Sequence, residues 1–452
     1  MGSAPRERSL HPKKSHLRAL EIRMKKRTVR PLLALASACL LPTALFAQTS
    51  PQTPQAPPSQ PVNQPINPAA LPLTQPLGLP PLPDPARRIE EPEPLQLRAT
   101  VGVERDDNVL RGPSGTEQTD EIGVLGVGAR FDRRVSQQRF LVDAEATTFR
   151  HRDLSNLDYS TLNYTAAWYW RVSDVLEGIA SADRRQYRDL GDTSVVALGD
   201  ISRRTERNEL LEGGYRLDGA WRVLAGVQQT SSSSNDPRSL DAYPQVRSVR
   251  AGVSYDFASG SAFTVRVRRG EGEYRGFPGI GDFEDNEVEG TLRWLLTAKT
   301  SIDARLAYLD RTHDTSPSRD FNGLVGFAHA SWEPTPKIRL VAGVSRDLGS
   351  YVFGPGGHVE SNRIFLAPVY RLTERITLNA RYEREAREWV DAAGSPDAGR
   401  DDRLNTLSAG VDWAPRRFVT ASTTIRREDR KSNIPFLNYK ATVLGVALKF
   451  TL

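Results

Sequence analysis

Polar and apolar residues alternate with a period of two along most of the chain. Residues 300–312 (TSIDARLAYLDRT) place Leu306 and Tyr308 on one face of an extended chain, and Asp303 and Arg305 on the other. Successive side chains of a β-strand point to opposite faces, so this pattern indicates a strand with one apolar face. The same pattern recurs about every 20 residues through the C-terminal four-fifths of the chain, with no helical period, which predicts an all-β protein of about 18 strands.

The connections between these predicted strands alternate between short and long. The short ones include Val135 to Gln138, Val172 to Leu176, Leu217 to Trp221, Phe257 to Ala262, Glu333 to Ile338, Arg371 to Ile376 and Ala414 to Phe418. The long, polar ones include Arg188 to Arg204, Ser231 to Gln245, Arg268 to Glu287, Arg346 to Asn362 and Glu388 to Arg403. Short turns on one rim and long loops on the other are typical of a transmembrane antiparallel up-and-down β-barrel of the bacterial outer membrane.

The tryptophans are sorted by rim. Only Trp389 lies toward the long connections, and the other six adjoin the short ones: Trp168, Trp170, Trp221, Trp294, Trp332 and Trp413. An aromatic girdle at a membrane interface has such a distribution, whereas tryptophans of a buried core would not be sorted in this way. The six are therefore predicted interface residues. The pattern also places both termini on the short-turn side, which faces the periplasm in outer-membrane barrels.

The last predicted strand carries a further signal. In residues 439–452 (YKATVLGVALKFTL), the positions of Gly445, Leu448 and Phe450 resemble the terminal-strand signal read by the outer-membrane barrel assembly machinery. The chain ends in Leu452, where that signal usually has an aromatic residue. We therefore expect the assembly machinery and outer-membrane lipid to be partners.

The basic character of the chain is confined to its start. Residues 1–47 hold ten Lys or Arg and two acidic residues, a net charge of +8, whereas the whole chain carries +6. The rest is thus slightly acidic, which removes the support for nucleic acid as a partner. A basic run before the apolar Pro31–Ala47 predicts a secretory signal in residues 1–47, with Met24 as the expected start. Cys39, the one cysteine, would leave with that signal, so disulfide and thiolate chemistry are not expected.

Residues 48–94 form a Pro/Gln-rich segment that contains 15 of the 31 prolines. Proline cannot continue a helix or donate a hydrogen bond to a sheet, so an extended, disordered periplasmic lead-in is expected. It would act as a plain spacer or as a docking ligand for a periplasmic partner. The barrel itself is predicted to span residues 95–452.

The first predicted strand runs into an unusual sequence. Residues 101–111 (VGVERDDNVLR) place Asp106, Asp107 and Asn108 ahead of an aliphatic pair and an arginine. With the signal segment and the Pro-rich lead-in, this resembles the β-barrel porins of exopolysaccharide operons, the EpsL-type proteins. The resemblance implies an outer-membrane exit route for a polysaccharide, with periplasmic export components as partners. By composition alone, the three residues are also ordinary turn formers that would cap a strand.

A barrel of about 18 strands would be about 35 Å across, wide enough for an aqueous lumen lined by the polar rows. Sixteen charged residues are the candidate lining: Arg139, Asp143, Glu145, Glu212, Arg216, Arg250, Asp256, Arg266, Arg268, Glu287, Glu289, Arg293, Asp303, Arg305, Arg381 and Glu383. Their signs are mixed, which does not favour a filter for ions of one sign. Such rows suit a neutral or weakly acidic polymer, or they simply solvate the lumen and brace the strands.

Nothing in the sequence points to catalysis. The four histidines after the signal, His151, His313, His329 and His358, have no spacing typical of a metal site or a Ser-based triad. We therefore expect no enzyme activity, no metal and no cofactor. Besides polysaccharide export, two functions stay open: a diffusion porin for small solutes, and a non-conducting anchor that organises a secretion complex.

Overall fold

The computed structural model describes residues 94–188, 203–234, 244–274, 281–350, 357–390 and 398–452. The chain divides into two units, residues 1–55 and 56–452, and every described residue belongs to the second. The predicted signal and almost all of the Pro-rich lead-in therefore lie outside the described residues.

The described part consists of antiparallel strands and three single 3-10 turns. The strands are β1 (Leu95–Asp106), β2 (Asp120–Val135), β3 (Gln138–His151), β4 (Tyr159–Arg171), β5 (Leu176–Arg188), β6 (Arg203–Arg216), β7 (Trp221–Ser234), β8 (Pro244–Asp256), β9 (Ala262–Tyr274), β10 (Phe283–Thr297), β11 (Thr300–His313), β12 (Phe321–Thr335), β13 (Ile338–Ser350), β14 (His358–Arg371), β15 (Ile376–Val390), β16 (Asp401–Arg416), β17 (Val419–Ser432) and β18 (Tyr439–Thr451). The 3-10 turns are η2 (Ser155–Leu157), η4 (Pro317–Arg319) and η5 (Pro435–Leu437). None of these helical turns is long or apolar enough to cross a membrane.

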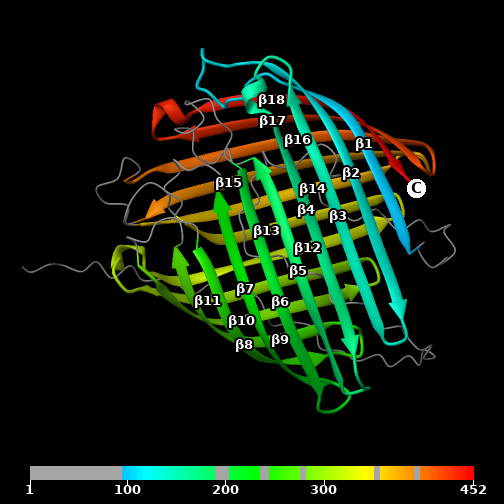
Figure 1. Ribbon diagram of the computed structural model, residues 1–452, viewed down its shortest axis with the longest axis vertical. Coiled ribbons are helices and arrows are strands. Elements are labelled where there is room, and N and C mark those ends of the chain that lie inside the picture. Colours follow the sequence, from blue (N-terminus) through cyan, green and yellow to red (C-terminus); the bar gives the residue numbers. More distant parts are fainter. Residues whose placement is uncertain (1–93, 189–202, 235–243, 275–280, 351–356, 391–397) are drawn as a thin grey trace, which may run out of the picture. The chain divides into compact units, whose positions relative to one another are not determined.

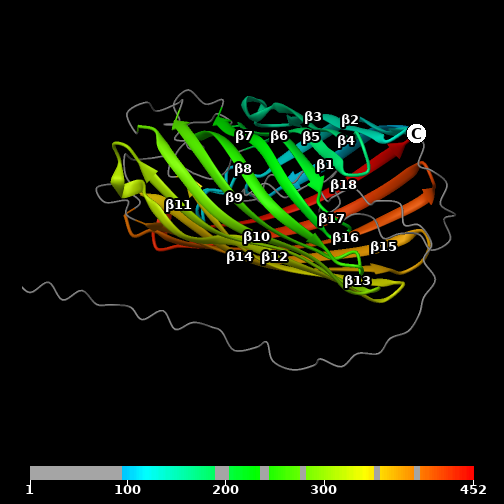
Figure 2. The ribbon, with the colours of Figure 1, turned by 90° about the horizontal axis from the view of Figure 1, so that it is seen from below.

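The sheet closes on itself to form a barrel. Each strand pairs with its neighbours in sequence, and β1 also pairs with β18, from Arg98 opposite Thr451 to Asp106 opposite Val443. Closure leaves no unpaired sheet edge, which a polar backbone requires inside a lipid bilayer. Figures 1 and 2 show β7–β9 and β15–β17 on opposite walls of the barrel. The prediction of an all-β antiparallel barrel of about 18 strands is confirmed.

Inward and outward side chains alternate along every strand. On β11, Leu306 is 60% exposed and Tyr308 is exposed beside it, whereas Ala307 is 1% exposed and Leu309 is buried. Exposed Val, Leu, Ile and aromatic residues recur at every second position of the other strands. An outer surface of this composition is suited to lipid rather than to water.

The connections sort onto two rims. Connections of two to five residues join the strands at one end, which we call the short-turn rim: 136–137, 172–175, 217–220, 257–261, 298–299, 336–337, 372–375 and 417–418. The others, from 107–119 to 433–438, lie at the long-loop rim. Strand β1 starts at the short-turn rim and β18 ends there, next to each other in the sheet.

The strands extend further toward the long-loop rim than the sequence pattern predicts. Arg268 and Glu287, the expected ends of one long connection, are directly paired across β9 and β10. Arg346 and Asn362 are likewise paired across β13 and β14. The predicted connections 231–245 and 388–403 are shortened in the same way. The prediction was wrong here because polar side chains occupy both faces near this rim, so the period of two disappears while the backbone ladder continues.

Candidate functional site: the inner wall of the barrel

Charged side chains meet across intervening strands on one side of the sheet. Arg98 of β1 donates to Asp143 of β3 over the top of β2, with Nη1 3.0 Å from Oδ2. Arg222 of β7 similarly reaches over β6 to Glu177 of β5, at 3.1 Å. Side chains converge on the concave face of a closed sheet and diverge on the convex face. These contacts therefore identify the inner wall.

The structure places all sixteen candidate lining residues in inner rows. On β8, for example, Arg250 and Asp256 are inward, whereas Val249 and Val253 are exposed on the outer surface. On β9, Arg266 is buried on the inner side and alternates with outward valines.

A continuous chain of ion pairs crosses the inner wall from β6 to β11. Its links are Glu212–Arg250 (2.6 Å), Glu212–Arg266 (3.3 Å), Arg266–Glu289 (3.3 Å), Glu289–Arg305 (2.5 Å), Arg305–Glu287, Glu287–Arg268 (2.9 Å), Arg268–Asp285 (3.7 Å) and Asp285–Arg311 (2.7 Å). Five arginines and four carboxylates are nearly balanced. The chain of pairs therefore braces the wall without imposing a strong field of one sign.

The remaining candidates pair in smaller groups or lie apart. Their contacts are Arg139–Asp132 (2.8 Å), Arg98 with Asp143 and Glu145, Arg222–Asp256 (2.7 Å), Arg216–Glu177 (3.7 Å) and Arg381–Glu383 (2.5 Å). Asp303 is the exception, because its carboxylate forms no hydrogen bond or ion pair with a described residue.

A second buried cluster, which the sequence did not reveal, lies near the long-loop rim between β14 and β17. Glu385 is 1% exposed and accepts from Ser361 (2.6 Å), Arg363 (3.2 Å) and Arg387 (2.9 Å). Asp402 binds two further arginines, Arg400 (2.9 Å) and Arg430 (2.6 Å). Several of these residues fell in a predicted connection, so they were not assigned to a wall.

Arg400 also explains the tryptophan that departed from the girdle pattern. Its guanidinium lies 3.9 Å from the centre of the Trp389 ring, and both side chains are buried. Trp389 is in an inner row of β15, so it packs inside the barrel rather than at a membrane interface.

The segment that follows β1 folds against the inner wall. Arg111 Nε donates to Glu428 Oε2 of β17 at 2.9 Å, and Arg111 Nη1 donates to Asp106 Oδ2 at 2.7 Å. The Asn108 side chain accepts from the Gly112 amide (2.8 Å) and donates to the Lys440 carbonyl of β18 (2.9 Å). The family-like motif therefore has a structural role in this chain. Asp106 and Asn108 shape the turn and anchor it.

Asp107 anchors the same turn from its exposed side. Its Oδ1 accepts the Thr442 amide at 2.6 Å, and its own amide donates to the Thr442 carbonyl at 3.1 Å. These bonds extend the pairing of β1 with β18 by one step. The interpretation of the three residues as turn formers thus agrees with their contacts.

Arg111 is held in an uncommon backbone conformation, with a φ of 57°. A non-glycine residue at positive φ is strained unless its surroundings hold it in place. The pKa of Arg111 is raised above its ordinary value: burial alone would lower it, but the carboxylates of Glu428 and Asp106 outweigh burial. Arg111 thus stays charged and locks the segment to the wall.

An apolar cluster lies beside this anchor. Val109 is fully buried and packs with Ile122, Val124, Phe149 and Leu157. The Val109 carbonyl also accepts a hydrogen bond from Arg188 of β5 at 3.0 Å. Side chains from the 107–119 segment, from the inner rows of β2 and β3 and from the η2 turn thus fill space inside the barrel near the long-loop rim.

The predicted interface tryptophans are all outward. Trp168, Trp221, Trp294, Trp332 and Trp413 are exposed near the short-turn rim. Trp170 is less exposed because its ring lies flat on the sheet. A Cβ on Gly178 would stand 2.3 Å from Trp170 Cζ2, so only glycine leaves room for the ring. In the last strand, Leu448, Phe450 and Leu452 are outward, whereas Gly445 is inward.

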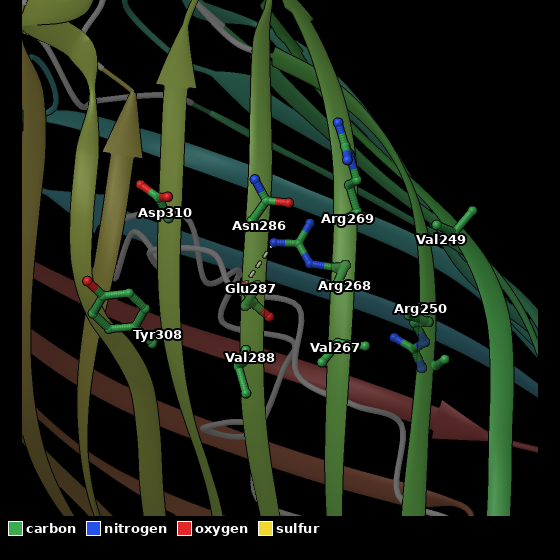
Figure 3. A pocket seen from close by; sticks show the side chains of 11 residues that line it. Val249, Arg250, Val267, Arg268, Arg269, Asn286, Glu287, Val288, Tyr308 and Asp310 are labelled. Atoms are coloured by element: carbon green, nitrogen blue, oxygen red, sulfur yellow. Dashed lines mark hydrogen bonds and ion pairs between the residues drawn. The ribbon is translucent and has the colours of Figure 1, made fainter.

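A hollow of about 540 Å³ lies over β8–β11, and it opens outward. Eight of its eleven lining residues belong to outward rows, among them Val249, Val267, Val288 and Tyr308. Figure 3 shows these side chains, together with the inward pair Arg268 and Glu287. The hollow is therefore a feature of the apolar outer surface and not part of the lumen.

His313 and His151 make structural contacts near the long-loop rim. His313 Nε2 lies 2.9 Å from the Tyr274 hydroxyl, and its backbone amide donates to Asp320 Oδ1 at 2.7 Å. His151 donates to Asp158 in the same way, at 2.7 Å. Within the described ranges, no group of three or more His, Asp or Glu side chains is arranged to hold a metal ion.

Comparison with known proteins adds a partial match. Residues 282–452 match the family described as "Putative beta-barrel porin 2". This range covers β10–β18, so the matched part is the second half of the barrel. No curated protein matches the chain.

Solved structures with a similar arrangement include an outer-membrane protein and a porin of Pseudomonas. OccK1 (OpdK) of Pseudomonas aeruginosa is 11% identical, with a TM-score of 0.44, over 79% of this chain and 99% of that one. OccK2 (OpdF) of the same species, solved with glucuronate, is 12% identical, with a TM-score of 0.45, over 79% of this chain and 98% of that one. A BenF-like porin from Pseudomonas fluorescens Pf-5 is 9% identical, with a TM-score of 0.46, over 80% of this chain and 99% of that one.

Proposed function

We propose that this protein is a passive channel of the bacterial outer membrane that admits small hydrophilic solutes. One observation carries the proposal: a closed barrel presents apolar side chains outward and charged, hydrogen-bonded side chains inward. Such a barrel is stable only with lipid outside, and its inner wall is suited to water and polar solutes. The match of β10–β18 to a β-barrel porin family supports the same function.

The geometry near the long-loop rim favours small solutes over a polymer. Arg111, Glu428 and Val109 are buried there, at 2%, 0% and 0% exposure. The 107–119 segment thus occupies space that a polysaccharide chain would need. Polysaccharide export, which the EpsL-type resemblance implied, has no support from the comparisons and is the second candidate.

The proposed orientation places the short-turn rim and both chain termini in the periplasm, as in other outer-membrane barrels. Outer-membrane lipid would contact the apolar rows, and the barrel assembly machinery would read β18. A docking role for the Pro-rich lead-in would bring a periplasmic partner to that rim.

Reconstitution in planar lipid bilayers tests the function. We expect discrete conductance steps from the purified full-length protein, and larger steps from Arg111→Ala, which frees the 107–119 segment. Bilayers without steps would overturn the channel and favour the non-conducting anchor.

Deletion of the gene in its native host separates the two kinds of cargo. Slower uptake of small solutes with unchanged surface polysaccharide is the expected result. Loss of surface polysaccharide, restored by complementation, would instead establish export.

A further inference from the structure

Three aromatic rings form a plate midway along the inner wall. Phe327 and His329 are consecutive inward residues of β12, with ring centres 4.9 Å apart. Phe365 of β14 lies edge-on to His329, with ring centres 5.4 Å apart and planes at 65°. All three rings are partly exposed. By contrast, Phe283 and Trp389, inward aromatic residues near the long-loop rim, are only 2% and 6% exposed. We call the three rings the aromatic plate.

Gly343 of β13 makes the plate continuous. It is paired with His329 on one side and with Phe365 on the other. A Cβ at Gly343 would stand 2.5 Å from His329 Cδ2 and 2.5 Å from Phe365 Cε1. The two rings therefore fold over the bare backbone of β13 and meet above it.

Polar groups flank the plate on both sides. Asp303 of β11 is paired directly with His329, and its carboxylate has no hydrogen-bond or ion-pair partner among the described residues. Arg381 of β15 lies 3.9 Å from the centre of the Phe365 ring and pairs with Glu383, with Nη2 2.5 Å from Oε2. The plate thus has an open acceptor at one edge and a guanidinium at the other.

The local charge sets the class of ligand. Arg381 pairs with Glu383, which also binds Arg363 at 3.3 Å. Arg305, the next inward residue after Asp303, is bound to Glu287 and Glu289. Among the described residues, no cation forms an ion pair with Asp303, and Arg293 of β10 lies opposite it in the register. At its own edge of the plate, the Asp303 carboxylate would repel a carboxylate-bearing solute, whereas a neutral solute with hydroxyl donors would gain a hydrogen bond there.

We propose that the aromatic plate is a binding subsite for one neutral pyranose ring. Axial C–H groups on one face of a pyranose carry partial positive charge and stack on the negative faces of aromatic rings. Its equatorial hydroxyls would donate to Asp303 and accept from Arg381. Phe327, His329 and Phe365 supply the stacking surface from two strands separated by Gly343. The inference rests on the proposed function, because solutes must enter the lumen.

Isothermal titration calorimetry of the full-length protein in detergent micelles, with maltotriose as the probe, tests the subsite without requiring conductance. We expect saturable binding, weakened about fivefold by Phe365→Leu or Phe327→Leu, since leucine keeps apolar volume but removes the ring face. The matched control is Tyr169→Leu. Tyr169 is also an inner-wall ring beside an arginine, 5.8 Å from Arg139, but it lies outside the plate. The control should bind maltotriose as the unmodified protein does.

A second variant tests the charge argument. Asp303→Asn keeps the shape of the side chain but removes its charge, so glucuronate should bind more tightly and maltotriose more weakly. The subsite is overturned if maltotriose does not bind, if Tyr169→Leu weakens binding as much as Phe365→Leu, or if glucuronate binds the unmodified protein more tightly than maltotriose.

Bilayer recordings keep the two proposals apart. If maltotriose blocks the current through the unmodified protein and the Phe365→Leu variant is blocked less, both proposals are supported. A conducting channel whose protein binds no sugar in the titration overturns the subsite alone. Sugar binding by a protein that never conducts supports the subsite and overturns the channel.

Discussion

Arg111 Nε lies 2.9 Å from Oε2 of Glu428, although the two residues are 317 positions apart in the chain. Glu428 also pairs with Arg426 at 2.9 Å, and it is fully buried. A single contact thus ties the segment after β1 to β17, across the seam where the first and last strands close the barrel. The β1–β18 ladder closes the barrel, and Arg111 holds the 107–119 segment against the inner wall beside that seam.

Replacing Arg111 should therefore be costly. Arg111→Gln leaves two buried carboxylates, Glu428 and Asp106, without their shared cation. Removing one partner of a buried pair costs about 3–5 kcal/mol. The urea midpoint for unfolding in lipid vesicles should fall accordingly. Arg269→Gln is the control, because its pair with Glu284 is exposed on the outer surface and is worth about 0–1 kcal/mol. Equal midpoints for the two variants would contradict the proposed anchor.

The outer surface can be tested with one charge. Leu306 is an outward residue midway along β11. Arginine at such a position costs about 2–4 kcal/mol near the middle of a bilayer. Leu306→Arg should insert poorly into lipid vesicles, as measured by the fraction of protein with the gel mobility of the folded barrel. Leu306→Ala, which adds no charge, should insert nearly as well as the unmodified protein. Normal insertion of the arginine variant would show that this face does not contact lipid.

Gly178 should tolerate no side chain. A Cβ there would stand 2.3 Å from both the Glu212 carbonyl oxygen and Trp170 Cζ2. Gly178→Val should destabilise the barrel by about 1–3 kcal/mol, the usual cost of overpacking. Tryptophan fluorescence should report the displaced ring. Gly219→Ala is the control, since no atom lies within 4 Å of a Cβ added there. An unchanged emission spectrum in Gly178→Val would contradict the described packing.

The connection between β3 and β4 should respond to acid. The pKa of Asp158 is lowered from its ordinary value near 3.8, first by the backbone amide of His151 and then by Arg150. A carboxylate with a lowered folded pKa stabilises the folded state above its unfolded pKa. It loses this contribution as pH falls through the folded value. The protection of the amides of residues 149–160 against hydrogen exchange, taken relative to the intrinsic exchange rate at each pH, should therefore fall below about pH 4.

Asp158→Asn is the matched variant for this pH effect. Asparagine keeps an oxygen that can accept the His151 amide but cannot titrate, so the protection of this segment, relative to the intrinsic exchange rate, should not change with pH in that range. A pH response that survives the Asp158→Asn substitution would assign the effect to another group.

The repeated connection could have been found in the sequence. His151 and Asp158 are seven positions apart, as are His313 and Asp320, and an aromatic residue follows each aspartate. In both connections the carboxylate accepts the amide that ends the preceding strand, with a 3-10 turn between them. A similar bond joins Ser432 to Asn438, at 2.6 Å. The sequence signal is a spacing between polar residues, which a search for strand periodicity does not detect.

Local pattern was enough to predict the strands, their approximate number, the two unlike rims and the inner rows. Side-chain direction in a strand follows from its period of two. In a closed sheet surrounded by lipid, the apolar rows must face the lipid and the polar rows the lumen. Residues such as Arg250 and Val249 could therefore be assigned to opposite faces from their positions alone.

Only the tertiary structure decided which residues meet. The pairing of Arg111 with Glu428 depends on the closure of β1 against β18, and the aromatic plate depends on the registers that set His329, Gly343 and Phe365 side by side. These registers are fixed by the ladder hydrogen bonds of many strands together, because a shift of one residue would turn an entire row to the opposite face. Local sequence carries the direction of each side chain, whereas its neighbours come from strands that can lie hundreds of residues away.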